Sequence, residues 1–189
     1  RYCIENYLCC ENGLINLLVT NYGNSISHYK SKIEFSKTIN KFCIYFQKIA
    51  IRYFIAQQLG CQTSFKKAPD FFYIRQGGIF EIDKVKVKAE INRVEILIKQ
   101  KLKQNKIKAY NSELNRLISE VEAKNPFNIN NYLKVISGKD FLLPVLEKKM
   151  KIVESGLTGW TTDQFKRQLA ERIDISTLER VKKKMESLV

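Results

Sequence analysis

The sequence contains a single histidine, no pair of cysteines spaced as CxxC, and no apolar run of about 18 residues. Without such a run we expect no transmembrane span, and no signal peptide is visible. An odd number of cysteines without CxxC spacing argues against a disulfide framework and against a structural zinc site. We therefore expect a cytoplasmic protein whose cysteines are partly buried thiols: Cys3, Cys9, Cys10, Cys43 and Cys61.

The one histidine, His28, follows a polar stretch at 24–27. This setting favours a surface loop or the start of a helix over a catalytic or ligand-binding role. No internal repeat or low-complexity linker divides the 189 residues, and this length suits one domain or one domain with a small appendage.

Positively charged residues outnumber negatively charged ones in this sequence. The chain has 33 lysine and arginine residues against 19 aspartate and glutamate residues, a formal net charge of +14. Such an excess favours a polyanionic partner: DNA, RNA or an acidic protein surface. An AT-rich genome is the alternative explanation, because lysine far outnumbers arginine and both asparagine and isoleucine are abundant. The charge by itself leaves both explanations open.

The apolar spacing predicts a mainly helical chain. Residues 4–19 predict a short element, a turn at Gly13 and a helix, and 21–27 predicts a polar loop. A long helix is predicted over 31–59, ended by Gly60. Its aromatic and apolar stripe is typical of a core rather than of a base-stacking surface. The stripe consists of Phe42, Tyr45, Phe46, Ile49, Tyr53 and Phe54.

The middle of the chain predicts a small β excursion followed by the most basic helix. Strand-forming residues at 71–74 and 79–82 flank Gly77-Gly78 and predict a hairpin. Asp83 is placed to cap a helix that runs to about Lys106. Its lysines form either a solvated face or a surface that contacts phosphates. The candidate nucleic-acid-binding residues are Lys86, Lys99, Lys101, Lys103 and Lys106.

The last third predicts short elements. A helix begins at Ser112, residues 132–136 predict a strand, Ser137-Gly138 a turn, and 140–153 a helix with Pro144 in its first turn. Capping boxes start further helices at two places, Thr161–Gln164 and Ser176–Glu179.

Two stretches carry a resemblance to a known family. The chain opens inside the run Ile4-Glu5-Asn6-Tyr7-Leu8 without an initiator methionine, which we interpret as the sign of a fragment. The second stretch is Val135-Ile136-Ser137-Gly138-Lys139-Asp140, followed by Phe141-Leu142-Leu143. Together they resemble the C-terminal half of TOPRIM-type nucleases of the OLD (overcoming lysogenization defect) kind. They are most similar to the single-TOPRIM effectors that act beside an ABC-type ATPase in PARIS-type phage defence.

The resemblance implies an active site to which this chain would contribute only some of the residues. Glu5 matches a late acidic position and would bind Mg²⁺ or Mn²⁺, Lys139 matches a catalytic lysine, and Gly138 would supply the turn that aims it at the cleft. Nothing in the chain matches the family's early Glu motif or its Asp-x-Asp pair. The family also implies a DNA or RNA substrate and an ATPase subunit as partner, with a homo-oligomer as a further expectation. Because the chain has no long apolar run, we expect no membrane partner.

The same resemblance shapes the expected fold. We expect a mainly α fold with a few short strands, made of the C-terminal portion of a TOPRIM-like α/β domain plus a helical region. The end of that core would span 1–30, a helical insertion with the β excursion 31–130, and the strand, turn and last helices 131–189. Read without the family, Glu5 is a carboxylate at a helix start and Gly138-Lys139 is a plain turn.

Three functions therefore compete. The first is a metal-dependent nuclease of which this chain is the C-terminal part. The second is a non-enzymatic, basic helical module that binds nucleic acid, and the third is a scaffold that docks on an ATPase partner. The nuclease interpretation requires that Glu5 and Lys139 face one cleft, although they are far apart in the sequence.

Overall fold

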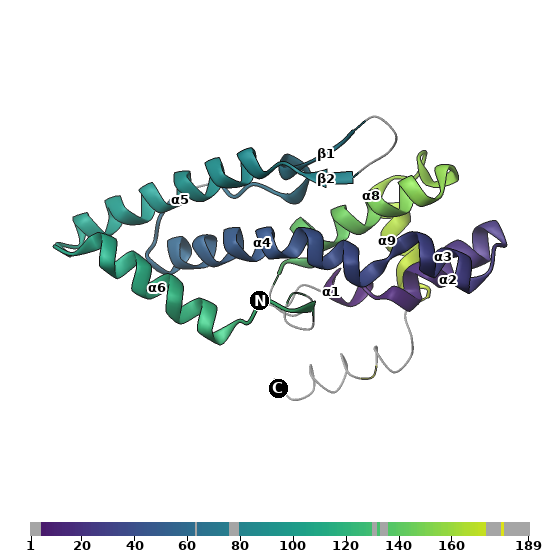
Figure 1. Cartoon of the computed structure of the whole chain (residues 1–189), viewed down its shortest axis with the longest axis horizontal. Helices are drawn as coiled ribbons and strands as arrows, with labels where there is room; N and C mark the ends of the chain where they lie inside the picture. Colours follow the sequence, from purple (N-terminus) through teal and green to yellow (C-terminus); the bar gives the residue numbers. More distant parts are fainter. Residues whose placement is uncertain are drawn as a thin grey trace. The chain divides into compact units, whose positions relative to one another are not determined.

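A computed structural model describes residues 5–62, 64–75, 80–129, 132, 136–172 and 179. Over these residues the chain is mainly helical and contains one two-stranded antiparallel sheet (Figure 1). The chain divides into two units: unit 1 comprises 1–38 and 137–189, and unit 2 comprises 39–136. None of the described helices combines enough length with enough apolar character to cross a bilayer.

Unit 1 is built from short helices whose apolar faces share one core. Its elements are α1 (Glu5–Leu8), α2 (Glu11–Tyr22), α3 (Ile26–Ile33), the first residues of α4 (Phe35–Gln58), the π-helical turn η2 (Gly138–Leu142), α8 (Leu143–Val153), the 3₁₀ turn η3 (Ser155–Leu157) and α9 (Thr162–Ala170). The most buried side chains include Leu17 of α2, Tyr29 of α3, Leu146 of α8 and Phe165 of α9. Segments from both ends of the sequence therefore build this core.

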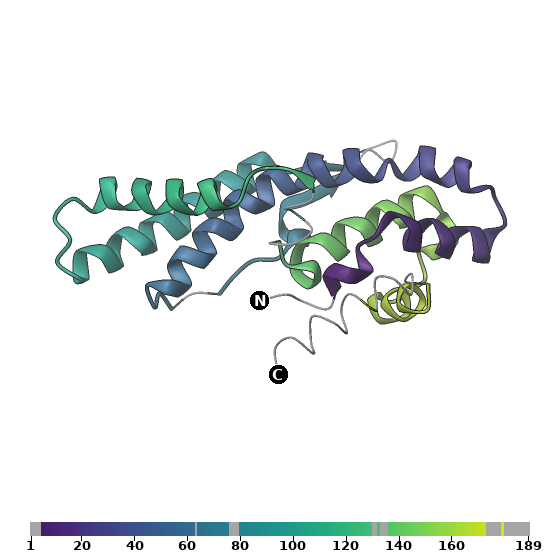
Figure 2. The same cartoon turned by 90° about the horizontal axis from the view of Figure 1, so that it is seen from below.

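Unit 2 combines the rest of α4 with a β-hairpin and a helical hairpin. Its other elements are the 3₁₀ turn η1 (Ala68–Phe71), β1 (Phe72–Ile74), β2 (Phe80–Ile82), α5 (Lys84–Gln104) and α6 (Tyr110–Lys124). Figures 1 and 2 both show α5 and α6 running side by side and joined at one tip. The β-hairpin packs on α4 through aromatic rings, with the Phe42 and Phe80 centroids 4.4 Å apart.

Local signals in the sequence predicted several element ends that the structure confirms. Gly60 follows α4 with a left-handed φ of 71°. The Asp83 carboxylate accepts a 3.0 Å hydrogen bond from the Lys86 N–H at the start of α5. Thr161 and Gln164 form the predicted capping box of α9. The predicted hairpin is present, with Tyr73 opposite Glu81.

Two helix boundaries differ from the prediction. The expected helix 31–59 is two helices, because Glu34 adopts a left-handed conformation with φ 46° between α3 and α4. Near the start, the break lies before α2, while Gly13 is buried inside that helix. The N-terminal helices are therefore set by burial of their apolar faces rather than by the glycine.

The strand predicted over 132–136 is wrong at the described residues. Tyr132 is helical, and its N–H donates to the Asn128 carbonyl at 2.9 Å, while the Ile136 N–H donates to the Tyr132 carbonyl at 3.0 Å. A short apolar run fits a buried helical turn as well as a strand, and a strand requires a partner edge. Residues 133–135, most of the predicted capping box at 176–179, and Cys3 lie outside the described residues.

Candidate nucleic-acid interface

Unit 2 carries most of the positive charge of the chain. Residues 39–136 contain 18 lysines and arginines against 8 aspartates and glutamates, which is +10 of the total formal charge of +14. Unit 1 has a similar number of residues and carries only the remaining +4. A compositional bias of the genome would act on both units alike. The uneven distribution therefore favours a polyanion-binding surface on unit 2.

The lysines predicted to contact phosphates lie toward opposite ends of α5. Lys86 is in the first turn of the helix and Lys103 is in the last. A rise of about 1.5 Å per residue puts these two positions roughly 25 Å apart along the helix axis. Lys99 and Lys101 are partly exposed, and Lys103 and Lys106 are exposed. The lysines predicted to contact phosphates therefore lie on two surfaces rather than on one.

We call Lys99, Lys101, Lys103 and Lys106 the distal lysines. Among the described residues, none of their ammonium groups has a carboxylate within ion-pair distance, whereas Lys86 pairs with Asp83 at 3.6 Å. The Lys103 Nζ lies 4.3 Å from the centroid of the Tyr110 ring on α6. The distal lysines thus present positive charge that unit 2 does not itself neutralise.

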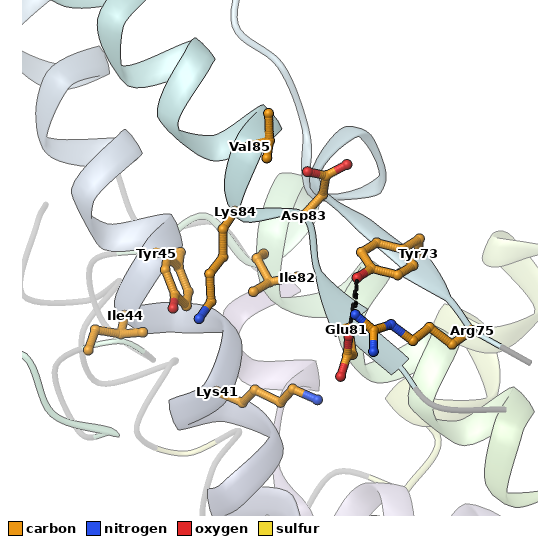
Figure 3. A pocket seen from close by; sticks show the side chains of 10 residues that line it. All are labelled: Lys41, Ile44, Tyr45, Tyr73, Arg75, Glu81, Ile82, Asp83, Lys84 and Val85. Carbon is orange, nitrogen blue, oxygen red and sulfur yellow. Dashed lines mark hydrogen bonds and ion pairs between the residues drawn. The ribbon is translucent and has the colours of Figure 1, made fainter. Parts of the chain in front are cut away.

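A groove of about 980 Å³ opens where α4, the β-hairpin and the start of α5 meet (Figure 3). Tyr45 comes from α4, Tyr73 and Arg75 from the hairpin, and Lys84 from the first residue of α5. Figure 3 shows the Lys84 side chain beside the Tyr45 ring, with Ile82 of β2 on the other side of Lys84. The groove therefore brings together cations and aromatic rings from three elements.

The two carboxylates of the groove already have partners. Glu81 accepts a hydrogen bond from the Tyr73 hydroxyl at 3.1 Å and pairs with the Arg75 Nε at 3.0 Å. The hydrogen bond to Tyr73, followed by the charge of Glu81, raises the pKa of the Arg75 guanidinium. Asp83 is held by the N–H and the ammonium of Lys86. These carboxylates are therefore largely neutralised within unit 2.

Two cations of the groove remain without a carboxylate. The Lys41 Nζ donates a 2.6 Å hydrogen bond to the Phe80 carbonyl, and the Lys84 Nζ lies 6.0 Å from the Tyr45 ring centroid. In the part of the chain that the structure describes, neither ammonium has a carboxylate within ion-pair distance. The groove is consequently positive, with an aromatic ring between its uncompensated charges.

The groove was not predicted from the sequence, whose pattern indicated a buried stripe that includes Tyr45. Phe42, Phe46 and Tyr53 of that stripe are buried. Tyr45, however, is half-buried, and Phe54 is 50% exposed. The polar tip of a tyrosine is the signal that could have marked an edge position, because buried tyrosines need a partner for the hydroxyl.

A buried polar cluster stands on the same helices away from the groove. Both carboxylate oxygens of Glu90 accept hydrogen bonds from Arg93, at 2.6 and 2.9 Å, and one also accepts from the Tyr53 hydroxyl at 2.7 Å. Burial alone would raise the pKa of Glu90, but these donors hold it below its usual value. Burial, then the bond to Glu90, raises the pKa of Tyr53.

This cluster fastens a loop rather than forming a reactive site. The Lys66 N–H donates to the Tyr53 hydroxyl at 3.0 Å, and Arg93 donates to the Ser64 carbonyl at 3.0 Å. Every polar atom of Glu90 is engaged in these bonds. Tyr53, Glu90 and Arg93 therefore hold the loop after α4 against α5.

The structure brings the two family-like stretches together within unit 1. Gly138 is buried in the first position of η2, and its N–H donates a 2.7 Å hydrogen bond to the side-chain oxygen of Asn6 in α1. Glu5 begins α1, and Lys139 is exposed in η2. The side chain of Glu5 lies outside the description, so the predicted common cleft of Glu5 and Lys139 stays a prediction.

The metal site that the family implies for this pair of stretches stays a prediction. Within them, no group of three or more histidine, cysteine, aspartate or glutamate side chains is placed to hold an ion. Asp140, the carboxylate next to Lys139, accepts a 3.1 Å hydrogen bond from the Ser137 hydroxyl. Mg²⁺ is usually held by one or two carboxylates together with water and phosphate oxygens, and Glu5, whose side chain lies outside the description, is the carboxylate that the family implies.

The resemblance to TOPRIM-type nucleases rests on the short stretches that contain Glu5 and Lys139. No protein-family model, curated protein or solved structure matches the chain significantly. The function proposed below therefore rests on the charges, contacts and burial of this chain's own residues.

Proposed function

We propose that unit 2 is a nucleic-acid-binding module that holds the phosphate backbone with exposed lysines. The observation that carries this proposal is the concentration of +10 of the +14 net charge in residues 39–136. The distal lysines and the groove cations Lys41 and Lys84 add surfaces where no carboxylate of the described residues neutralises this charge. Phosphate groups of a nucleic acid would neutralise the positive charge of these lysines.

The residue types favour backbone contacts over base readout. Lysine is a compact point charge, whereas arginine is the residue that pairs with guanine through two parallel hydrogen bonds. Of the arginines of unit 2, Arg52, Arg75, Arg93 and Arg116 all pair with carboxylates. We therefore expect binding that depends little on sequence and strongly on salt.

A salt titration tests this proposal directly. The chain is mixed with a fluorescent duplex of 20 base pairs, and the dissociation constant is measured by anisotropy at several salt concentrations. We expect the logarithm of the association constant to fall linearly with the logarithm of salt concentration, by about 0.9 for each phosphate neutralised. Lack of binding at low salt, or affinity that ignores salt, would refute the proposal.

A metal-dependent nuclease of the TOPRIM kind is a second proposal. The hydrogen bond from Gly138 to Asn6 favours it, because this bond places the helix that begins with Glu5 against the turn that carries Lys139. Mg²⁺ or Mn²⁺ would be held by Glu5 together with further oxygen ligands, since the described residues contain no group of three or more ligating side chains. DNA or RNA would be the substrate, and an ATPase subunit or a second copy of the chain a partner.

A further inference from the structure

We infer that the groove between α4 and the β-hairpin binds an unpaired nucleotide, with its base on the Tyr45 ring and its phosphates near Lys41 and Lys84. This inference rests on the proposed function and deepens it, because it makes single-stranded nucleic acid the preferred ligand. Three features of the groove support it: its charge, the setting of Tyr45, and the apolar surface beside that ring.

The charge of the groove suits a phosphodiester backbone. Lys41 comes from α4 and Lys84 from the start of α5, so they approach the groove from different elements. The Lys41 ammonium donates to a backbone carbonyl at 2.6 Å and lies 5.7 Å from the Phe42 ring centroid, and the Lys84 ammonium lies 6.0 Å from the Tyr45 ring centroid. A phosphate would offer both cations a stronger partner than either has now.

Tyr45 is the ring in the groove that is available for stacking. Tyr73 is fixed by its hydrogen bond to Glu81 at 3.1 Å and by Arg75, whose Cζ lies 5.8 Å from the ring centroid. Tyr45 has only the more distant Lys84 ammonium, and in the described part of the chain its hydroxyl makes no hydrogen bond. A base could therefore replace a weak contact on Tyr45 without breaking a hydrogen-bond network.

Apolar surface beside Tyr45 would cover the rest of a planar base. Ile44 is 40% exposed and Val85 is 79% exposed, and both line the groove. Exposed branched side chains next to an aromatic ring and two cations form a surface that is apolar in the middle and positive around it. Stacked bases with charged flanking phosphates have the complementary pattern.

An unpaired strand fits this arrangement better than a duplex does. The face of a base is hidden by its neighbours in a double helix and becomes free only when the base leaves the stack. A duplex could use the lysines but not the Tyr45 ring. Acidic peptides would likewise use the lysines and gain nothing from the ring, so the contribution of Tyr45 separates these ligands.

Three probes of matched charge test the inference on the whole chain. They are a fluorescent 12-mer of deoxythymidine, an abasic 12-mer with the same sugar-phosphate backbone, and polyglutamate of similar charge. We expect the wild type to bind the thymidine strand more tightly than the other two. Tyr45→Ala should weaken binding of the thymidine strand roughly 5- to 100-fold and leave binding of the abasic strand unchanged.

Two variants guard against an effect of misfolding. Tyr45→Phe keeps the ring and should bind the thymidine strand like the wild type. Phe54→Ala removes an exposed ring from the same helix, outside the groove, and should not change the preference between the strands. Thermal melting of each variant reports whether the fold is intact.

The outcomes separate this inference from the proposed function. Equal affinity of the wild type for all three probes would overturn the base site, and so would Tyr45→Ala weakening the thymidine and abasic strands alike. Both results would leave phosphate binding by unit 2 intact. Failure to bind the thymidine strand, the abasic strand or a duplex at low salt would refute the proposed function as well.

Discussion

The side-chain oxygen of Asn6 accepts a 2.7 Å hydrogen bond from the backbone N–H of Gly138, 132 residues further along the chain. Gly138 is buried, so this N–H has no access to bulk water in place of Asn6. The bond fixes α1 against the turn that precedes α8. It also explains why an amide stands inside the apolar opening of the chain, since this position needs an acceptor.

Replacing Asn6 by alanine should destabilise unit 1. The Gly138 N–H would lose its acceptor, and we expect the free energy of unfolding to fall by about 1–3 kcal/mol. Asn12→Ala is the matched control, because Asn12 is an exposed asparagine of the adjacent helix and should change stability by less than about 0.5 kcal/mol. Urea denaturation measures both variants. If Asn6→Ala is as stable as Asn12→Ala, the bond between Asn6 and Gly138 contributes nothing to the stability of unit 1.

Reversing two distal lysines should weaken nucleic-acid binding whatever the sequence of the duplex. For Lys103→Glu with Lys106→Glu we expect lower affinity and a salt slope smaller by about 0.9 for each phosphate that the variant no longer neutralises. Lys86→Glu should have a smaller effect, because Lys86 already pairs with Asp83.

A charge-matched variant in unit 1 is the control for this prediction. Lys30 and Lys32 are exposed in the last turn of α3, and their double replacement by glutamate changes the net charge by the same amount. We expect it to leave most of the affinity in place. If both double variants weaken binding equally, net charge rather than the surface of unit 2 determines the affinity.

The buried carboxylate of Glu90 should make unit 2 sensitive to acid. Its pKa in the folded chain lies below its value in the unfolded chain, so its stabilising contribution is present above that unfolded value. The contribution is lost as the pH falls through the lower, folded pKa, in the range below about pH 4. The free energy of unfolding should therefore fall from pH 5 to pH 3.

Glu90→Gln isolates this contribution. We expect a loss of about 1–3 kcal/mol at pH 7, because Arg93 and the Tyr53 hydroxyl lose a charged partner, and a flatter dependence on pH than in the wild type. Glu113 and Glu34 also have lowered pKa values, but both residues are present in the wild type and in Glu90→Gln, so they do not contribute to the difference between the two. Stability curves that stay parallel from pH 7 to pH 3 would rule out the role given to Glu90.

The nuclease proposal predicts separable effects of its two residues in a protein that contains the complete site. Glu5→Ala should abolish cleavage of nucleic acid with Mg²⁺ or Mn²⁺ and lower metal affinity. Lys139→Ala should slow cleavage by roughly 10²- to 10³-fold and leave metal binding nearly unchanged. Lys139 is exposed, so this variant should melt like the wild type. Wild-type cleavage rates in both variants would exclude these residues from the reaction.

Local sequence signals predicted the parts of the fold that local interactions decide. The cap at Asp83, the end of α4 at Gly60 and the capping box at Thr161 each depend on residues within one helical turn. Likewise, His28 lies in the first turn of α3, which fits the predicted surface loop or helix start, and its backbone N–H donates to the Ser25 hydroxyl oxygen.

The candidate sites depended on contacts that no local signal contains. Lys41 and Lys84 reach one groove because α4, the β-hairpin and the start of α5 meet there, and Tyr45 borders it because its neighbours in the stripe turn inward. The amide of Asn6 meets Gly138 only when both ends of the chain share a core.

The sequence alone thus determined helix content, the hairpin, the caps at Gly60, Asp83 and Thr161, and the excess of positive charge, since these follow from spacing and composition. Tertiary structure alone decided that Tyr132 is helical, that Glu90 is buried with three donors, and which lysines keep an uncompensated charge. The physical reason is that burial and pairing depend on atoms from distant segments. A short apolar run or a lysine has the same local signal in either environment.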